Sequence, residues 1–600
     1  MNQSNNRNTI SMSAVVTTLG VGFGTLLNLI LIYKKTPFLY LFFYVLLFYI
    51  GYKFLFGDIE KTSWVMTSVN IFSLIIRPDP LFSSAQNVYY PQILSNYNYG
   101  NIKNYWIAKI PEPYPAFSSL NKFFINYFGI QSINIILFII STLFIFSIFL
   151  LLSNENNSST NYSFIAVVTI TLLLAIDSSP PNWINDANIF KVSIANLLGV
   201  SNMLLDGISA YSEFNSRRSL IPASFDILIL LSIVLFTKKR YKEGILLGIV
   251  ISLFHYYSFV NLAILIASLG LTRYLFKRKN MVLVYSFIVV LAPLILYIST
   301  GIFENLEISK DINNSLDILY KRGSSEWILL PVLSFGSFLR PSTVENPFYF
   351  EFDISTFSFV ESTHALTFVS PTLGTFENLS VLPLEFLLIC LFGFMCSYKI
   401  NSYFIANVIF LGSVITITTW FFQTRYLLGA LAIFHPWRFS GILTLLSSLM
   451  ILSYLLSKID RKILVSLKYL SLGLIFLSPL TNTLYNDIDP DQSFLDSKLK
   501  PYTVLNSGTV MIPHDKETWI LNSGGISAYS TRLFPYDLGY SDEWYSKYLL
   551  QMEIESSLSC SELEKSIEKV EEEIVLIVTY GGRKVAKLEG QCSVEIIVYK

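Results

Sequence analysis

The chain has 600 residues, of which 52% are hydrophobic and 15% aromatic, whereas only 14% are charged. Soluble domains carry about 25% charged residues, so this composition, with its mean hydropathy of +0.52, excludes an ordinary soluble protein and favours many lipid-buried segments. The formal net charge of zero gives no basic footprint for nucleic acid. Four cysteines and four histidines leave little material for a Cys/His metal site.

Apolar stretches recur along the chain at lengths near the roughly 20 residues that a membrane-spanning helix needs. The polar start reads as a tail and not as a cleavable signal. A short apolar stretch over 64–76 is expected to be an interfacial helix. We expect a polytopic α-helical membrane protein with about twelve spans, near residues 13–33, 36–56, 131–152, 162–177, 222–237, 244–258, 260–276, 281–299, 380–397, 402–421, 438–456 and 463–481.

Short basic segments between these spans predict which side faces the cytoplasm. With twelve spans, all five basic segments fall on the same side of the membrane. That side is then the cytoplasm, and the long loops lie outside. One missed span between two of these segments would place them on opposite sides. The segments are Lys34–Lys35, KKRYK at 238–242, KRK at 277–279, Lys399 and KIDRK at 458–462. The expected outer loops cover about 57–130, 178–221 and 300–379.

The C-terminal stretch from about residue 482 has a more mixed polarity than the apolar segments before it. The stretch SCSELEKSIEKVEEE has helical spacing and many charges, whereas EIVLIVTYGG and CSVEIIVYK resemble strands. We therefore expect a transmembrane domain over 1–481 and a small extracytoplasmic α/β domain over 482–600. Cys560 and Cys592 both lie in this tail, and the sequence leaves open whether they pair, although an oxidising compartment would permit it.

The stretch LFGDIEKTSW places Asp58 and Glu60 where the second expected span leaves the lipid. Their oxygens could hold a divalent cation, or one carboxylate could accept a proton from an attacking hydroxyl group. The plainer alternative is a charged flank at a helix end, with Lys61 as its neighbour. The spacing alone leaves both interpretations open.

Further acids lie near outer span ends. Asp177 and Asp186 could supply a second carboxylate to a site that clamps a metal or an acceptor. Asp226 lies just inside the fifth expected span, where a carboxylate is costly and is usually functional or paired. His255 and His435 are expected to be structural.

Arginines on the outer side run against the positive-inside bias, so they need a reason. Arginine binds phosphate bidentately, which suits a lipid phosphate, whereas the alternative is a salt bridge to a loop acid such as Glu213. The candidates for lipid phosphate are Arg217, Arg218, Arg425 and Arg438, with Arg340 as a weaker one. The sequence contains no Walker A loop and no HExxH motif.

Three stretches carry a family resemblance: PEPYPAFSSLNKFFINYFGI, RRSLIPASFDILILLSIVLF before a basic turn, and HPWRFSGILTLLSSLMILSYLL. In pattern they resemble the GT-C class of membrane glycosyltransferases. The tail stretch STRLFPYDLGYSDEWYSKY resembles the outer domain of bacterial GT-C-like membrane proteins.

The resemblance implies transfer of a sugar, with inversion, from a polyprenyl-phosphate donor to a glycan, lipid or protein acceptor outside the cell. In that class a carboxylate of the first outer loop is the base or binds Mg²⁺ or Mn²⁺, which points to Asp58, with Glu60 as the near alternative. Asp177 or Asp186 would assist. One departure is that the acid follows the second expected span, where the class has it after the first. The implied location is a bacterial inner membrane.

Three rival interpretations remain open. A lipid-linked polysaccharide polymerase or ligase also needs outer arginines and a long outer loop, but it would not need Asp58. A transporter would show internal repeats and polar residues at mid-membrane depth, and the expected spans are nearly free of charge. A non-catalytic membrane protein fits the same composition.

Overall fold

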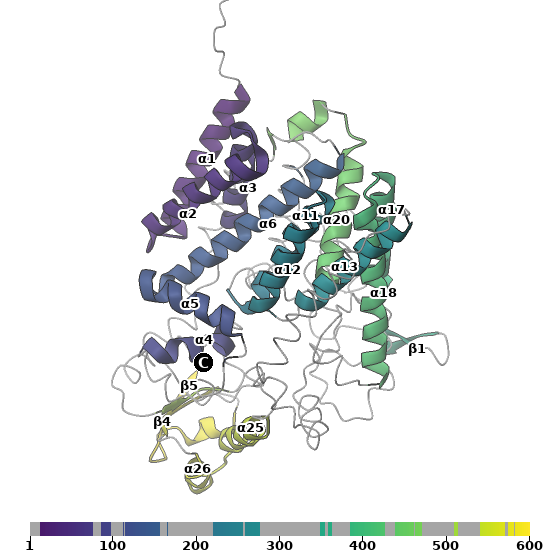
Figure 1. The fold of residues 1–600 in the computed structure, drawn as a ribbon. Coiled ribbons are helices and arrows are strands. Elements are labelled where there is room, and N and C mark those ends of the chain that lie inside the picture. The colour runs from purple at the N-terminus through teal and green to yellow at the C-terminus, as the bar shows by residue number, and fades with distance from the viewer. Residues whose placement is uncertain are drawn as a thin grey trace, which may run out of the picture.

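The computed structural model describes a mostly helical chain with a small α/β unit near the C-terminus, as the sequence predicts (Figure 1). The described residues are 12–75, 86–97, 112, 114–156, 165, 220–255, 258–275, 349–353, 358–362, 384–426, 439–460, 462–467, 469–470, 509–513, 541–570, 574–580 and 583–599.

The first helices form a hairpin that packs on a third helix. The elements are α1 (Met12–Leu31), α2 (Pro37–Ile50), its π-helical continuation η1 (Gly51–Phe56) and α3 (Ile59–Ile75). Pro37 occupies the first turn of α2, where its missing N–H is no loss. Gly57 ends η1 with a left-handed backbone (φ 69°), which separates η1 from α3.

α3 departs from the interfacial helix expected over 64–76. The helix has 17 residues, and every side chain from Trp64 to Leu74 is buried. It packs along α1, where Nδ2 of Asn28 donates a 3.0 Å hydrogen bond to Oδ1 of Asn70. An interfacial helix exposes one face, so this expectation was wrong: α3 is a core helix. The segment 57–130 is therefore not a single loop.

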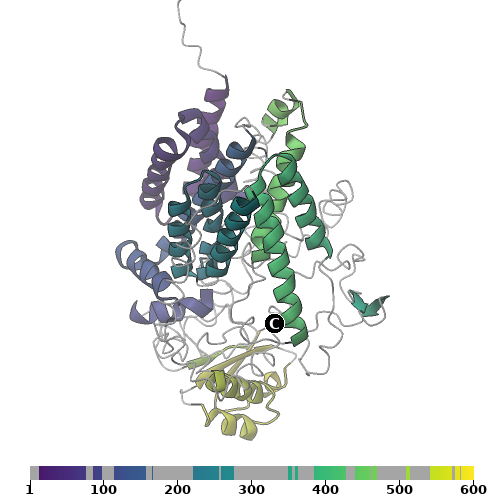
Figure 2. The ribbon, with the colours of Figure 1, turned by 45° about the vertical axis from the view of Figure 1, so that its right-hand side comes forward.

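In the described part of the chain, four short elements connect α3 to α6, a long apolar helix. They are α4 (Gln86–Leu94), η2 (Ser95–Tyr97), α5 (Pro115–Phe128) and η5 (Ile130–Ser132), which precede α6 (Ile133–Asn156). α4 and α5 lie at the start of α6, between the helix bundle and the C-terminal unit (Figures 1 and 2).

The second half of the bundle consists of apolar helices. These are η6 (Pro222–Leu228), α11 (Ile229–Thr237), α12 (Tyr241–Phe254), α13 (Ser258–Leu275), α17 (Leu384–Lys399), α18 (Tyr403–Tyr426) and α20 (Ser440–Leu456). α17 and α20 approach so closely that a Cβ added to Gly393 would lie 2.4 Å from Cβ of Ser447. Glycine is therefore required at this crossing.

The two ends of the bundle differ. At one end, termed the basic end, the turn 238–242 joins α11 to α12, and Arg273 stacks over the ring of Tyr241 at 4.2 Å. Phe236 lies 5.8 Å from Phe404, ring centroid to centroid, so the turn after Lys399 is at this end too. At the other end, termed the α5 end, the start of α6 and the end of α12 share an apolar cluster with α4, α5 and η6.

The C-terminal unit lies at the α5 end (Figures 1 and 2). Its three parallel strands follow the order β3-β4-β5. A disulfide joins Cys560, the first residue of α26, to Cys592, just before β5, with a Cα–Cα distance of 5.3 Å. The elements are β3 (Thr509–Met511), α25 (Ser541–Glu555), α26 (Cys560–Ile567), β4 (Ile574–Tyr580), η14 (Val585–Leu588) and β5 (Glu595–Tyr599). A separate antiparallel hairpin consists of β1 (Tyr349–Asp353) and β2 (Ser358–Ser362).

Two helices in the described part of the chain are long and apolar enough to cross a membrane, Pro37–Phe56 and Ile130–Ser153. The twelve expected spans therefore remain a prediction. Large apolar side chains are exposed on α2, among them Phe38, Phe42 and Val45. Shorter apolar helices cover Thr17–Leu31, Pro222–Thr237, Ser258–Arg273, Leu388–Lys399, Tyr403–Thr416 and Gly441–Leu456.

Candidate functional site

The acids singled out first, Asp58 and Glu60, are both exposed. Oδ1 of Asp58 accepts a 2.8 Å hydrogen bond from the backbone N–H of Glu60, and its backbone carbonyl accepts from N and Oγ1 of Thr62. Asp58 therefore caps the N-terminus of α3, which is a common structural role of aspartate. This favours the plainer of the two interpretations that the spacing left open.

The metal site expected at these acids gains no further ligand. Mg²⁺ and Mn²⁺ prefer a nearly octahedral shell of oxygens, and one carboxylate oxygen of Asp58 is already used for capping. Within the described residues, no three His, Cys, Asp or Glu side chains are grouped so that they could hold a metal ion. The metal thus stays a prediction, and no step below depends on it.

The segment with Asp58 lies at the basic end. Burial lowers the pKa of Lys238, and the nearby positive charges of Lys61 and Arg240 lower it further. Lys61, one residue after Glu60, is therefore close to the turn 238–242. The sequence predicted these two segments on opposite sides of the membrane. The structure places them together, because the buried helix α3 adds one crossing of the bundle before α4. Lys34–Lys35, before α2, lies instead at the α5 end, so the expectation that all five basic segments share one side was wrong.

The other predicted site residues are not brought together in the described structure. Arg425 falls in the last turn of α18. The remaining candidates lie outside the described residues: Asp177, Asp186, Arg217, Arg218, Arg340, Arg438 and His435.

The α5 end instead contains a buried polar cluster of Asp226, His255 and Ser258. Nδ1 of His255 lies 2.7 Å from both Oδ1 and Oδ2 of Asp226, and the hydroxyl of Ser258 donates to Oδ1. All three side chains are almost fully buried. Each comes from a different element, η6, the end of α12 and the start of α13, so the cluster joins three parts of the fold.

Local backbone geometry places these groups. His255 ends α12 with an extended backbone (φ −147°, ψ 105°), and its carbonyl accepts a 3.0 Å bond from the N–H of Ser258. This tight connection turns the chain into α13 and brings both side chains to one point. Asp226 reaches that point from the 3-10 helix η6, which precedes α11.

The hydrogen-bond arrangement of the cluster limits its chemistry. An ionised carboxylate only accepts hydrogen bonds, so Nδ1 of the imidazole donates to Asp226. Asp226 thereby fixes the orientation of His255, as carboxylates do for histidines in metal and proton-transfer sites. Since the hydroxyl of Ser258 faces Asp226 and not His255, the cluster is not a Ser–His–Asp triad for nucleophilic attack.

The PEPYP segment connects this cluster to α4 and α5. The ring of Tyr114 lies 5.6 Å from that of His255, centroid to centroid, and 5.7 Å from that of Tyr89. Nε2 of Gln86 donates a 3.4 Å hydrogen bond to the carbonyl of Leu220, just before η6. The helices α4, α5 and η6 thus pack together at the α5 end.

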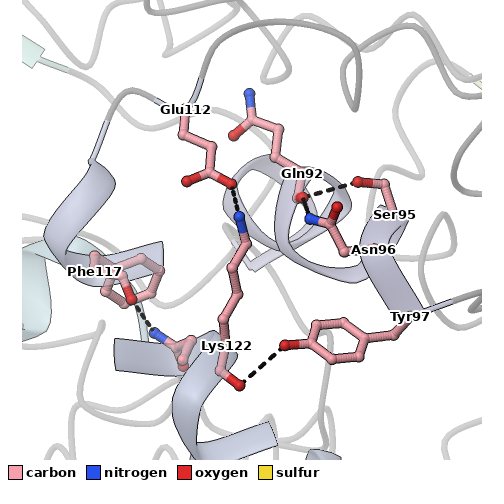
Figure 3. Close-up of polar contacts among 8 residues, drawn as sticks. Gln92, Ser95, Asn96, Tyr97, Glu112, Phe117 and Lys122 are labelled. Atoms are coloured by element: carbon pink, nitrogen blue, oxygen red, sulfur yellow. Dashed lines mark hydrogen bonds and ion pairs between the residues drawn. The ribbon is translucent and has the colours of Figure 1, made fainter. Parts of the chain in front are cut away.

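An ion pair holds the segment before α5 in place. Figure 3 shows Nζ of Lys122 paired with the carboxylate of Glu112, while the hydroxyl of Tyr97 donates a 3.0 Å bond to the carbonyl of Lys122. Within α4 and η2, the carbonyl of Gln92 accepts from Ser95 and Asn96. Glu112 is therefore an acid with a defined position, two residues before the tyrosine that contacts His255.

The sequence indicated that Asp226 is functional or paired, but it did not name a partner, and His255 was expected to be structural. One signal could have paired them: they lie at similar distances before and after the basic turn 238–242. In an antiparallel helix pair, such residues meet at the same end.

Comparisons with known proteins do not identify the chain: no protein-family model, no curated protein and no solved structure matches it.

Proposed function

We propose that this chain is a polytopic membrane glycosyltransferase of the GT-C kind. It moves a sugar from a polyprenyl-phosphate donor to an extracytoplasmic glycan, lipid or protein acceptor in a bacterial inner membrane. The observation that carries the proposal is the buried Asp226–His255 pair, held against the PEPYP segment at the end of the apolar bundle. Buried, hydrogen-bonded ionisable groups at span ends usually mark functional sites.

Two features support a membrane orientation. Short basic turns face the cytoplasm in membrane proteins, and the turns at 238–242 and after Lys399 lie together at the basic end, whereas the turn with Lys34–Lys35 lies at the α5 end. The disulfide between Cys560 and Cys592 suits an oxidising compartment, and the unit that contains it lies at the α5 end. The α5 end is then extracytoplasmic.

This orientation changes the acid that the resemblance assigns to catalysis. With α3 as a crossing helix, α1 and α2 are joined on the outer side at Lys34–Lys35, and the first long outer loop begins after Ile75 and not at Asp58. Its first acid in the chain is Asp79, which lies outside the described residues, and a later one is Glu112. Asp79 then follows the third crossing helix directly, which departs further from the class, where the acid follows the first span, and Asp58 lies on the cytoplasmic side.

The reaction is a direct displacement. The acceptor oxygen bonds to the anomeric carbon, the anomeric C–O bond to phosphate breaks, the acceptor proton passes to a carboxylate, and the polyprenyl phosphate leaves. We assign the carboxylate to Asp79 and the positioning of the PEPYP segment to Asp226 and His255. The outer arginines Arg217, Arg218 and Arg438 would neutralise the leaving phosphate.

The test is sugar transfer by the full chain in nanodiscs, with a radiolabelled polyprenyl-phosphate hexose as donor. Loss of a general base lowers the rate by about 10²- to 10⁴-fold, so Asp79→Asn should abolish measurable transfer while donor binding persists. Asp58→Asn should transfer normally. Glu243→Gln, which removes an exposed carboxylate at the basic end, is the matched control.

Other outcomes separate the rivals. Activity lost in Asp58→Asn but kept in Asp79→Asn would restore the first assignment and refute this orientation. Joining of lipid-linked oligosaccharides that survives both substitutions would favour a polymerase or ligase. No donor binding in any form would end the glycosyltransferase proposal.

A further inference from the structure

α5 has an exposed aromatic face. The helix buries Phe117, Phe124 and Ile125 but exposes Phe123 by 52% and Tyr127 by 71%. The two exposed rings are neighbours along the helix, with centroids 4.8 Å apart and planes tilted by 49°. A surface helix normally places charged residues on its outer face. The one charged residue of α5, Lys122, is paired with Glu112, so this outer face is uncharged; beside the rings, it exposes only Pro115, Ser119 and Asn126.

The aromatic face continues onto α2. The rings of Phe124 and Phe43 lie 6.0 Å apart, and Phe43 contacts Phe42 at 5.2 Å. Phe42 is 61% exposed and Phe38 is 87% exposed. α2 with η1 is one of the two described helices that are long and apolar enough to cross a membrane. The exposed face of α5 is therefore an extension of an apolar, outward-facing helix surface.

Positive charge adjoins this surface. Lys34 and Lys35 are exposed and directly precede α2, at the same end of α2 as the contact with α5. Aromatic rings prefer the boundary between headgroups and acyl chains, and lysines beside them attract anionic headgroups. The combination matches a membrane surface in both polarity and charge.

We propose that α5 lies in the interfacial layer of the bilayer, with Phe123 and Tyr127 among the upper acyl chains. Lys34 and Lys35 contact the phosphates of anionic lipids at the same level. Because Tyr114 immediately precedes α5 and contacts His255, the anchored helix sets the depth of the Asp226 cluster at the membrane surface. The inference needs α2 to span the membrane, but it does not need the sugar-transfer proposal.

Spin labels in the full chain test this directly. Single cysteines at Phe123→Cys and Tyr127→Cys are labelled in a Cys396→Ser background, because Cys390 is buried and the other two cysteines are paired. The samples are nanodiscs that contain phosphatidylglycerol. Leu549→Cys on α25, an exposed apolar position in the C-terminal unit, is the matched control.

The measured quantity is the collision rate of each label with oxygen, which enters the bilayer, and with a polar nickel complex, which does not. The oxygen-to-nickel ratio at 123 and 127 should exceed that at 549 several-fold. Equal ratios at all three positions would place α5 in water and overturn the proposal. Labels that are immobile and shielded from both reagents would show a protein contact, such as a second copy, and would also overturn it.

A second arm tests the lysines. Replacing phosphatidylglycerol by phosphatidylcholine should move the label at 127 outward, and Lys34→Ala/Lys35→Ala should abolish that lipid dependence. An identical depth in both lipids would remove the anionic headgroup from the proposal. Normal sugar transfer with a water-exposed α5 would refute this inference alone.

Discussion

The basic end and the α5 end of the bundle use the same residue type in opposite ways. Asp58, at the basic end, is exposed and caps its own helix. Asp226, at the α5 end, is buried and joins His255 to Ser258 across three elements. The difference teaches that an acid near a span end gains a special role from the partners that burial forces on it, and not from its spacing in the sequence.

The largest expected effect concerns which side each end faces. Glu60→Cys is at an exposed position on α3, and Asn96→Cys is at an exposed position in η2, at the α5 end. In intact cells a membrane-impermeant maleimide should label Asn96→Cys, whereas Glu60→Cys should react only after permeabilisation, because α3 lies between them. Lys242→Cys in the basic turn should behave like Glu60→Cys. Labelling of both Glu60→Cys and Asn96→Cys from outside would restore the single outer loop 57–130.

The next effect separates the two aspartates by stability. Asp226→Ala leaves two buried donors without their acceptor, which costs about 3 to 5 kcal/mol, whereas loss of a capping aspartate costs about 1 kcal/mol. Thermal unfolding in detergent should show a much larger loss for Asp226→Ala than for Asp58→Ala. Asp226→Asn, which keeps one acceptor oxygen, should fall between them. Equal losses would mean that the buried cluster contributes no more than an exposed cap.

The disulfide gives the α5 end a covalent constraint. Cys560 and Cys592 are 32 residues apart, and closing a loop of that length stabilises by about 3 to 4 kcal/mol. Cys560→Ser/Cys592→Ser should make the C-terminal unit sensitive to proteolysis at lower urea than the native chain. Cys396→Ser in α17 serves as the control. Alkylation of both thiols without reductant would contradict the pairing.

The smallest effect is at the basic end and depends on pH. Burial and the charges of Lys61 and Arg240 lower the pKa of Lys238 below its ordinary 10.5. Between the folded-state pKa and 10.5 the unfolded chain binds more protons, so stability rises with pH in that window. Relative to Lys238→Gln, the native chain should gain stability as the pH approaches 10.5. If the difference in stability between the native chain and Lys238→Gln does not change with pH, burial and the neighbouring charges do not lower the pKa of Lys238.

The apolar content by itself determined the class of fold. Long apolar stretches specify helices, and the charged helical stretch and the two strand-like stretches near the C-terminus specify an α/β unit, because these signals are local in the chain. The sequence also supplied both cysteines of the disulfide, but it could not pair them, because pairing requires that α26 and the segment before β5 meet.

Only the tertiary structure decided the place of α3 and, with it, the site. Taken alone, α3 looks too polar and too short to lie inside a bundle, because it contains Asn70 and several hydroxyl residues. Hydrogen bonds allow these polar groups to be buried. Asn70 is hydrogen-bonded to Asn28 and Tyr44 of neighbouring helices, and the hydroxyl of Thr67 donates to a carbonyl of its own helix. Such long-range satisfaction of polar groups leaves no periodic trace in a sequence. The same reason hid the pairing of Asp226 with His255, which exists only because two antiparallel helices end at the same point.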